Sequence, residues 1–418
     1  MKEISNLELK VKLTNEYLRN GGIEKIFDIQ LLEDIINTKF NANGEVDSNT
    51  ITSRLNAFMN VILFSQNLPP INLENKTSEY TSLIQKSLFF DQINIETEKE
   101  IDDLFEKYEN QTEIIFRGQR EAKWRLYSSL QRFWNWDNLK ENQNYVEFLK
   151  KIISAGKENY SKEIESILNE NHIDALNDIA ILSFLQHHDC PTPLLDWTYD
   201  FKISIYFAID GLEENNVVKE IADYFSIYFI EENDFQAGSV KSILDEGLSE
   251  IGENKKLELI NKIAKDESHK KEMIEHFKER SYIDRNRIKG SGLIEHMTKI
   301  EHMANIPLSY FSDKDITSGI AFSLINSNNI LNQNGAFTWN SHISKPIEVV
   351  GNEQFLENET EYEPNDYIFC SCYNINKKLE KYIREKLNKL NITEEYIYPD
   401  KELINTNHIY QSSRKAIS

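Results

Sequence analysis

Three segments of the sequence place polar side chains directly beside strongly apolar ones, and these residues are the first candidates for chemistry. In the first segment Arg117 follows the apolar run of residues 114–116 and precedes Gly118. A guanidinium next to a glycine that clears space suits the binding of a phosphate or a carboxylate. The alternative is an arginine that pairs with a carboxylate of the core, and the residues of this segment favour neither interpretation.

The second segment covers residues 186–198 and holds Asp196 between apolar neighbours. A carboxylate in such surroundings needs a partner, because burying an unpaired charge is costly. The simplest partners are Arg117 and Arg132 of the first segment. The sequence therefore predicts that residues far apart in the chain meet at one site.

Further side chains extend the predicted site. Trp197 can stack on a flat ring, and Thr198 is predicted to be the N-cap of the helix that follows. The third segment, residues 330–339, places Gln333 at the mouth of a predicted strand. Together the three segments predict a pocket lined by a guanidinium, a carboxylate and an amide.

Other kinds of site lack the residues that they need. The sequence contains no glycine-rich phosphate loop and no G-x-S-x-G motif, which disfavours P-loop, Rossmann and α/β-hydrolase sites. The run His-His-Asp-Cys at residues 187–190 points its side chains in different directions and has no second cluster at matching spacing, so no metal site is predicted. Cys370 and Cys372 lie on one face of a predicted strand and are interpreted as packed core thiols rather than a redox pair.

The elements that must position these residues follow both helical and strand patterns, which predicts an α+β fold. Helices are predicted at residues 1–65, from residue 97 onward, and at residues 139–169, 172–186, 199–209 and 377–390. Strands are predicted at residues 113–116, 224–229, 335–339 and 367–373. Thr97 and Glu100 carry the signature of a capping box at the start of one helix.

A polar segment that contains Pro69 and Pro70 interrupts the helical pattern of the N-terminal part. This break predicts an N-terminal helical region at residues 1–80 and a second domain at residues 81–418. Within the second domain, residues 238–305 become helical, charged and rich in lysine. We interpret that stretch as a helical insertion.

Composition disfavours several classes of protein. The 418 residues are 40% hydrophobic and 28% charged, as is typical of a globular rather than a disordered chain. A net charge of −22 repels nucleic acid and anionic membrane from most of the surface. Three cysteines, short apolar runs and an N-terminus without a signal-peptide pattern predict a cytoplasmic protein without a disulfide framework or a membrane partner.

The three segments resemble the FRG domain, a bacterial and phage family named for the tripeptide found here at residues 116–118. The matching residues are Phe116-Arg117-Gly118-Gln119, Trp124-Arg125-Leu126, Ser129-Leu130, Arg132, Gln186-His187, Pro191-Thr192, Leu194-Leu195-Asp196-Trp197-Thr198, Tyr206-Phe207-Ala208, Gln333, Gly335, Phe337 and Tyr398-Pro399-Asp400. The resemblance spans about residues 85–410 and is interrupted by residues 238–305. Its strength lies in the joint occurrence of these motifs in one order.

The order of these motifs is similar to that in ADP-ribosyltransferases. The resemblance implies a split or mixed β-sheet core of that type, flanked by helices, and NAD as the substrate. It implies that Arg117 is a catalytic residue that holds the diphosphate or ribose hydroxyls of NAD. Asp196 and Gln333, also implied to be catalytic, would contact the nicotinamide ribose together with Thr198. Trp197 or Tyr206 would pack against nicotinamide. The other positions assigned to the NAD site are Gln119, Arg132 and His187.

The sequence departs from the family pattern at charged positions. Pro193 and Asn329 stand where the family usually has arginine, so the affinity for an anionic ligand, or the choice of it, is expected to differ. Asparagines flank Gln333, so the glutamate expected in a transferase is missing there. Asp196 would then have to supply the negative charge that stabilises an oxocarbenium-like transition state.

The predicted function is NAD-dependent ADP-ribosyl transfer to a protein or RNA target by a toxin or phage-defence effector. An antitoxin or regulatory partner would accompany such an activity. The first alternative is an NAD glycohydrolase or a non-catalytic nucleotide-binding sensor. The second is an interaction module in which an Arg117–Asp196 contact is purely structural and the helices at residues 1–65 and 238–305 recruit a partner.

Overall fold

The computed structural model describes most of the chain beyond the predicted N-terminal region. The described residues are 78–87, 89–137, 139, 144–170, 176–212, 220–235, 260–261, 264–279, 292–314, 322–357, 368–399 and 404–415. The helices predicted at residues 1–65 lie outside them, as does most of the region predicted at residues 1–80. The fold below is that of the described residues.

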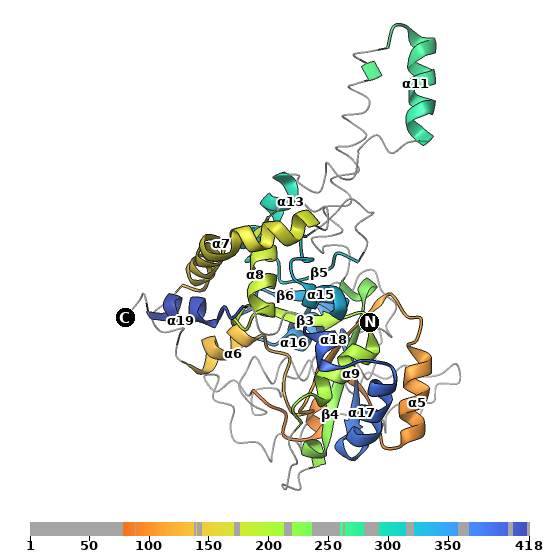
Figure 1. Ribbon diagram of the computed structural model, residues 1–418, viewed down its shortest axis with the longest axis vertical. Helices are drawn as coiled ribbons and strands as arrows, with labels where there is room; N and C mark the ends of the chain where they lie inside the picture. The colour runs from red at the N-terminus through yellow and green to blue at the C-terminus, as the bar shows by residue number, and fades with distance from the viewer. Residues whose placement is uncertain are drawn as a thin grey trace, which may run out of the picture. The chain divides into compact units, whose positions relative to one another are not determined.

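These residues form a mixed α+β structure built on a seven-stranded sheet (Figure 1). The strands are β1 (Asp91–Ile95), β2 (Ile114–Gln119), β3 (Leu194–Thr198), β4 (Tyr224–Glu231), β5 (Leu308–Phe311), β6 (Gly335–Asn340) and β7 (Ser371–Asn376). The chain divides into two compact units that are interleaved in sequence. The first comprises residues 1–127, 200–231 and 342–392, and the second comprises residues 128–199, 232–341 and 393–418.

The first unit contains four strands in the order β1-β7-β4-β2. β1 and β7 are parallel, whereas β4 pairs antiparallel with both β7 and β2. The helices of this unit are α4 (Leu83–Lys86), α5 (Glu98–Lys107), α9 (Phe201–Ile209), α16 (Ile347–Glu357) and α17 (Glu380–Lys389), with 3-10 turns at Glu220–Asp223 and Lys377–Leu379. Tyr108, Phe116 and Phe201 contact one another edge to face or tilted and form the apolar core on one face of the sheet.

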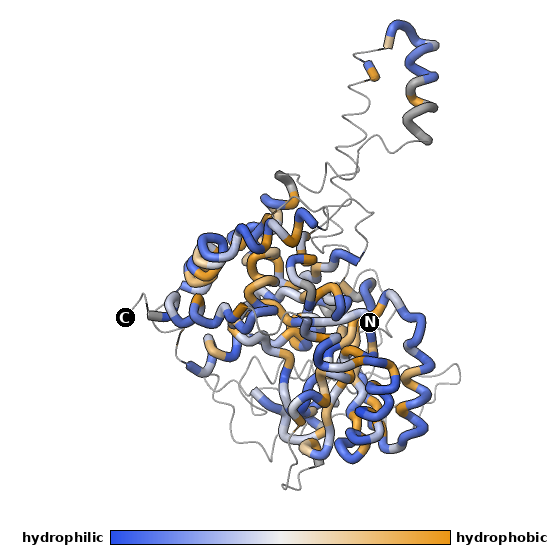
Figure 2. The backbone as a smooth tube through the Cα atoms, viewed as in Figure 1, coloured by the Kyte–Doolittle hydropathy of each residue, from blue (hydrophilic) through white to orange (hydrophobic). Residues whose placement is uncertain are grey.

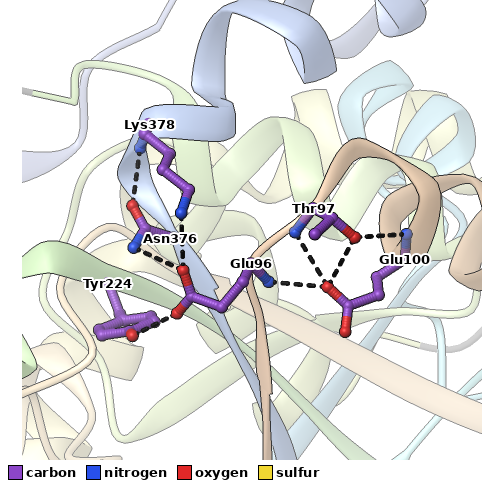
Figure 3. A network of polar contacts seen from close by, with 6 residues as sticks. All are labelled: Glu96, Thr97, Glu100, Tyr224, Asn376 and Lys378. Carbon is purple, nitrogen blue, oxygen red and sulfur yellow. Dashed lines mark hydrogen bonds and ion pairs between the residues drawn. The ribbon is translucent and has the colours of Figure 1, made fainter.

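Glu96 ties the ends of three strands of the first unit together. Its carboxylate follows β1 and accepts hydrogen bonds from the Tyr224 hydroxyl at the start of β4 and from Asn376 Nδ2 (3.0 Å) at the end of β7 (Figure 3). Lys378 Nζ donates to the same carboxylate at 2.8 Å. The predicted capping box follows directly and is confirmed, because the Thr97 and Glu100 side chains each bond the other residue's backbone N–H.

The second unit contains three antiparallel strands in the order β3-β6-β5. Its helices are α6 (Ser129–Trp136), α7 (Tyr145–Glu170), α8 (Asp178–His187), α11 (Glu267–Glu279), α13 (Gly292–Met297), α14 (Ile300–Met303), α15 (Asn328–Gln333), α18 (Glu394–Ile397) and α19 (Asn407–Lys415), with a 3-10 turn at Glu232–Phe235. Residues 179–185 of α8 are all buried, as its apolar sequence predicts. Figure 2 shows this helix mostly in the colour of hydrophobic residues, in contrast to α5 and α17.

The structure corrects three predictions about these elements. Thr198 is not the N-cap of a helix, because it is the last residue of β3, and Asp200 caps α9 instead. Residues 194–198, where the sequence predicts neither a helix nor a strand, form β3. Arg117 lies inside β2 rather than at its end. The described part of the predicted insertion at residues 238–305 is helical, with α11, α13 and α14.

Candidate functional site

β3 separates the predicted site residues onto two faces, because successive side chains of a strand point in opposite directions. Asp196 and Thr198 share one face with Leu194, whereas Trp197 points to the other face with Leu195. Trp197 is buried, and its Nε1 donates to Thr338 Oγ1 of β6 at 2.8 Å. Within the second unit this tryptophan therefore packs into the sheet, on the face opposite the carboxylate.

Asp196 is half-buried, and a side chain of the second unit donates a hydrogen bond to its carboxylate. Gln186 Nε2, near the end of α8, donates to Asp196 Oδ2 at 2.9 Å. The amide is fixed in turn by Thr192, whose hydroxyl donates to Gln186 Oε1 at 2.5 Å. Thr192 is itself held by α6, since its backbone N–H donates to Ser129 Oγ at 3.1 Å. A relay of hydrogen bonds thus defines which way the carboxylate faces.

His187 is the last residue of α8 and belongs to the same cluster. Its ring meets Phe337 edge to face at 5.4 Å between centroids, and Phe337 is the register partner of Asp196 on β6. The pKa of His187 is lowered to about 4, mainly by burial and to a smaller extent by His188, although the Asp196 carboxylate acts in the opposite direction. The imidazole is therefore neutral at pH 7. Its Nε2 atom is buried and has no hydrogen-bond partner among the described residues.

Thr198 and Gln333 lie close together, but the side chain of each donates to a backbone carbonyl. The Thr198 hydroxyl donates to the Gln333 carbonyl at 2.6 Å. Gln333 ends α15, and its side-chain Nε2 donates to the Ile397 carbonyl at the end of α18 at 3.1 Å. Asn334 then turns the chain into β6 with a positive φ of 48°. The Gln333 amide thus links α15 to α18 within the second unit.

The candidate residues of the first unit lie on β2 and α9. Arg117 and Gln119 share one face of β2, and their register partners on β4 are Tyr228 and Ser226. Gly118 points to the opposite face, where a Cβ atom would lie only 2.0 Å from the Ser204 carbonyl oxygen of α9. The glycine thus permits a close approach of α9 to β2, whereas the sequence predicts that it clears space for an anion. Tyr206 of α9 is buried.

Gln119 differs from the other buried amides of the first unit. Its side chain is 4% exposed, and neither amide atom has a hydrogen-bond partner among the described residues. The amides of Asn374 and Asn352, in contrast, make hydrogen bonds. Arg132, the remaining predicted contact, lies exposed on α6 of the second unit.

Several other polar residues are buried in the first unit. Arg125 and Glu348 form a buried ion pair with 3.1 Å between Nε and Oε1, and Tyr80 donates to the same oxygen at 2.6 Å. Lys86 is fully buried and donates to Ser226 Oγ at 2.7 Å. Arg125 belongs to the Trp124-Arg125-Leu126 motif, which marked the position without distinguishing a structural charge from a functional one. Lys86 carries no comparable signal.

Gln186 and Thr192 also lie within the motifs that resemble the FRG domain, but the sequence indicates no role for them. Among the described residues, no group of three or more histidine, cysteine, aspartate or glutamate side chains is arranged to hold a metal ion. The three cysteines are buried and free, and the pKa of each thiol is raised, first of all by burial. In the part of the chain that the structure describes, no helix is long and apolar enough to cross a bilayer.

Comparison with known proteins supports the FRG domain in part of the chain. Residues 112–217 match the family model described as the FRG domain. This stretch includes Arg117, Gln119 and the segment from Gln186 to Thr198, whereas Gln333 lies beyond it. No curated protein and no solved structure matches the chain.

Proposed function

We propose that this protein cleaves the glycosidic bond between nicotinamide and ribose in NAD and transfers the ADP-ribosyl group to a protein or RNA. The observation that carries the proposal is the Asp196 carboxylate, oriented by Gln186 and adjacent to a neutral imidazole within the stretch that matches the FRG domain. The order of the motifs is similar to that in ADP-ribosyltransferases, and this supports NAD as the substrate. We further propose that the protein is a toxin or a phage-defence effector and that an antitoxin or another regulatory partner accompanies it.

In the proposed reaction the bond between C1′ of the ribose and the nicotinamide nitrogen breaks, and its electron pair leaves with nicotinamide. Positive charge develops on C1′ and on the ring oxygen of the ribose. Asp196 stabilises this charge, because a fixed carboxylate needs no reorganisation as the cation forms. A nucleophilic hydroxyl, amine or carboxylate of the target then bonds to C1′, and an N–H or O–H nucleophile gives up its proton.

NAD hydrolysis is the second candidate, and His187 is the observation that favours it. A neutral imidazole beside the carboxylate can accept the proton of a water molecule that attacks C1′. Its low pKa makes it a weak base, which suits attack on an already cationic carbon. Transfer and hydrolysis share the bond cleavage and differ only in the nucleophile.

Asp196→Asn tests the proposal, because it removes the negative charge and keeps an oxygen that can accept the Gln186 hydrogen bond. Wild-type protein is incubated with cell lysate and NAD labelled in its adenosine half. Label on a macromolecule, sensitive to protease or to nuclease, supports transfer. Free ADP-ribose with nicotinamide supports hydrolysis instead. We expect Asp196→Asn to lower nicotinamide release roughly a hundredfold or more.

Stability separates a catalytic loss from a folding defect. Asp196 is half-buried, so the asparagine variant is expected to unfold within about 1 kcal/mol of the wild type. Gln186→Ala is the companion variant: it leaves the carboxylate in place but removes its orienting hydrogen bond, and an intermediate loss of rate is expected. Absence of nicotinamide release by the folded wild-type protein would refute the enzymatic proposal and leave the non-catalytic nucleotide-binding sensor and the interaction module.

A further inference from the structure

A row of polar side chains crosses one face of the sheet in the first unit. The row runs from Asn94 of β1 through Asn374 of β7 and Ser226 of β4 to Gln119 of β2, which are register partners of one another in turn. Side chains opposite one another on neighbouring strands lie within contact distance. The row is therefore expected to form a chain of hydrogen bonds from one strand to the next.

The chain of hydrogen bonds is complete from β1 to β4. Asn374 Nδ2 donates to Asn94 Oδ1 at 3.1 Å, and the Ser226 hydroxyl donates to Asn374 Oδ1 at 2.9 Å. The buried amine of Lys86 joins both, with 2.7 Å to Ser226 Oγ and 2.8 Å to Asn374 Oδ1. The Ser226 hydroxyl has thus used its only proton and accepts one hydrogen bond already.

Gln119 stands at the end of this row and does not join it. Its side chain is 4% exposed, and both Nε2 and Oε1 lack a hydrogen-bond partner among the described residues. Burying an amide without partners destabilises a folded protein, because the group loses its hydrogen bonds to water. Such a group calls for a specific explanation, and a ligand that completes its bonds is one.

We infer that Gln119 is a ligand-binding residue that recognises a flat chemical edge with a hydrogen-bond donor beside an acceptor. A carboxamide presents such an edge, and so does adenine, which glutamine can bind through two hydrogen bonds. A carboxylate lacks the donor, and so does a purine without the 6-amino group of adenine. Arg117 lies on the same face two residues earlier, so an anionic substituent on the ligand is favoured over a neutral one.

This inference does not depend on NAD cleavage, and it makes a prediction about stability as well as binding. Gln119→Met replaces the amide by an apolar chain of similar length. Because the unpaired amide is removed, we expect the unliganded variant to melt at a higher temperature than the wild type. Gln131 provides the matched control, since it is 1% exposed but its Oε1 accepts from the Ser128 N–H at 2.9 Å. Gln131→Met should melt at a lower temperature.

Binding is measured on the full chain by calorimetry and by the ligand-induced shift of the melting temperature. The probes are nicotinamide and adenosine monophosphate. Each is compared with a partner compound that lacks the donor: nicotinate for nicotinamide, and purine riboside monophosphate, which has no 6-amino group, for adenosine monophosphate. We expect one probe to bind and its partner not to, which identifies the source as carboxamide or purine. In Gln119→Met the dissociation constant of that probe should rise on the order of tenfold to a hundredfold.

Three results would overturn the inference. The first is a Gln119→Met variant that melts lower than the wild type, as a structural amide would require. The second is a variant that keeps the affinity of the wild type for the probe. The third is a wild-type protein that binds neither probe. Loss of NAD cleavage in the Asp196→Asn variant has no bearing on any of these, so the two proposals can fail separately.

Discussion

Buried polar groups are arranged differently in the two units. In the first unit Arg125, Glu348 and Lys86 are almost fully enclosed, and each bonds to other buried groups. In the second unit Asp196 and His187 are only partly enclosed, and Gln186 donates a hydrogen bond to the carboxylate. Paired interior charges fix the position of chain segments. A half-buried carboxylate beside a neutral imidazole keeps its capacity to react.

The motifs that resemble the FRG domain show the same difference between enclosed and partly enclosed polar groups. The residues Trp124-Arg125-Leu126 contribute an ion pair that joins segments of the first unit, since Arg125 bonds Glu348 on α16. Beside Asp196, in contrast, the buried Nε2 atom of His187 has no hydrogen-bond partner among the described residues. One family pattern therefore contains residues that are needed for folding and residues that are available for a substrate. Variants can separate the two sets.

The largest effect is expected from Gly118→Ala. The added Cβ would lie 2.0 Å from the Ser204 carbonyl oxygen and 2.7 Å from the Ala208 backbone nitrogen, and neither can move without moving α9. We expect the free energy of unfolding to fall by more than about 4 kcal/mol, or no folded protein to form. Denaturation in urea gives the value.

Gly335→Ala is the matched control in the second unit. Its Cβ would meet the Ile330 side chain at 2.8 Å, and a side chain can shift where a backbone cannot. A loss of about 1 kcal/mol is expected. Equal losses for the two glycines would show that the close packing of α9 on β2 is not what makes Gly118 necessary.

The buried ion pair should give the next largest effect. Glu348→Ala leaves the Arg125 guanidinium in the interior without its carboxylate, which costs about 3–5 kcal/mol. The double variant Arg125→Met with Glu348→Leu removes both charges and should recover part of that loss. Nicotinamide release per folded molecule should stay unchanged in the double variant. A folded double variant without activity would mean that this motif also serves the reaction.

Periodicity and capping could be read from the sequence because they are local. The capping box at Thr97 and the buried helix α8 follow from spacing that tertiary structure did not override. The core position of Cys370 and Cys372 followed from strand alternation and is confirmed by their burial. The sequence indicates that Gly118 clears space, but the expected occupant was an anion and the observed one is α9.

Other features depend on partners far away in sequence. β3 was missed because its five residues follow two prolines and resemble a loop, and only pairing with β6 makes them a strand. Thr198 was expected to cap a helix for the same reason. A lysine in a short helix is predicted to be exposed. Lys86 is buried because its amine donates to Ser226 and Asn374, which lie far away in the sequence. The sequence alone carries no signal for such contacts.

The smallest of the three effects concerns His187 and appears only as a function of pH. The pKa of His187 is lowered to about 4 in the folded protein, against about 6.5 in an unfolded chain. Between these values the unfolded state binds more protons than the folded state. The free energy of unfolding therefore decreases as the pH falls from about 6.5 to about 4, by up to about 3 kcal/mol from this group alone.

His187→Phe and His187→Gln remove the titrating group and should both flatten this pH dependence relative to the wild type. The difference between wild type and variant isolates His187, because the carboxylates titrate in both proteins. Neither variant can accept a proton in place of the imidazole, although Gln keeps a polar group beside Asp196, so both should lose water-dependent nicotinamide release. If the unfolding free energy of His187→Phe changes with pH as steeply as that of the wild type, the imidazole is not buried in its neutral form. The contrast between an enclosed first unit and a reactive second unit would then rest on Asp196 alone.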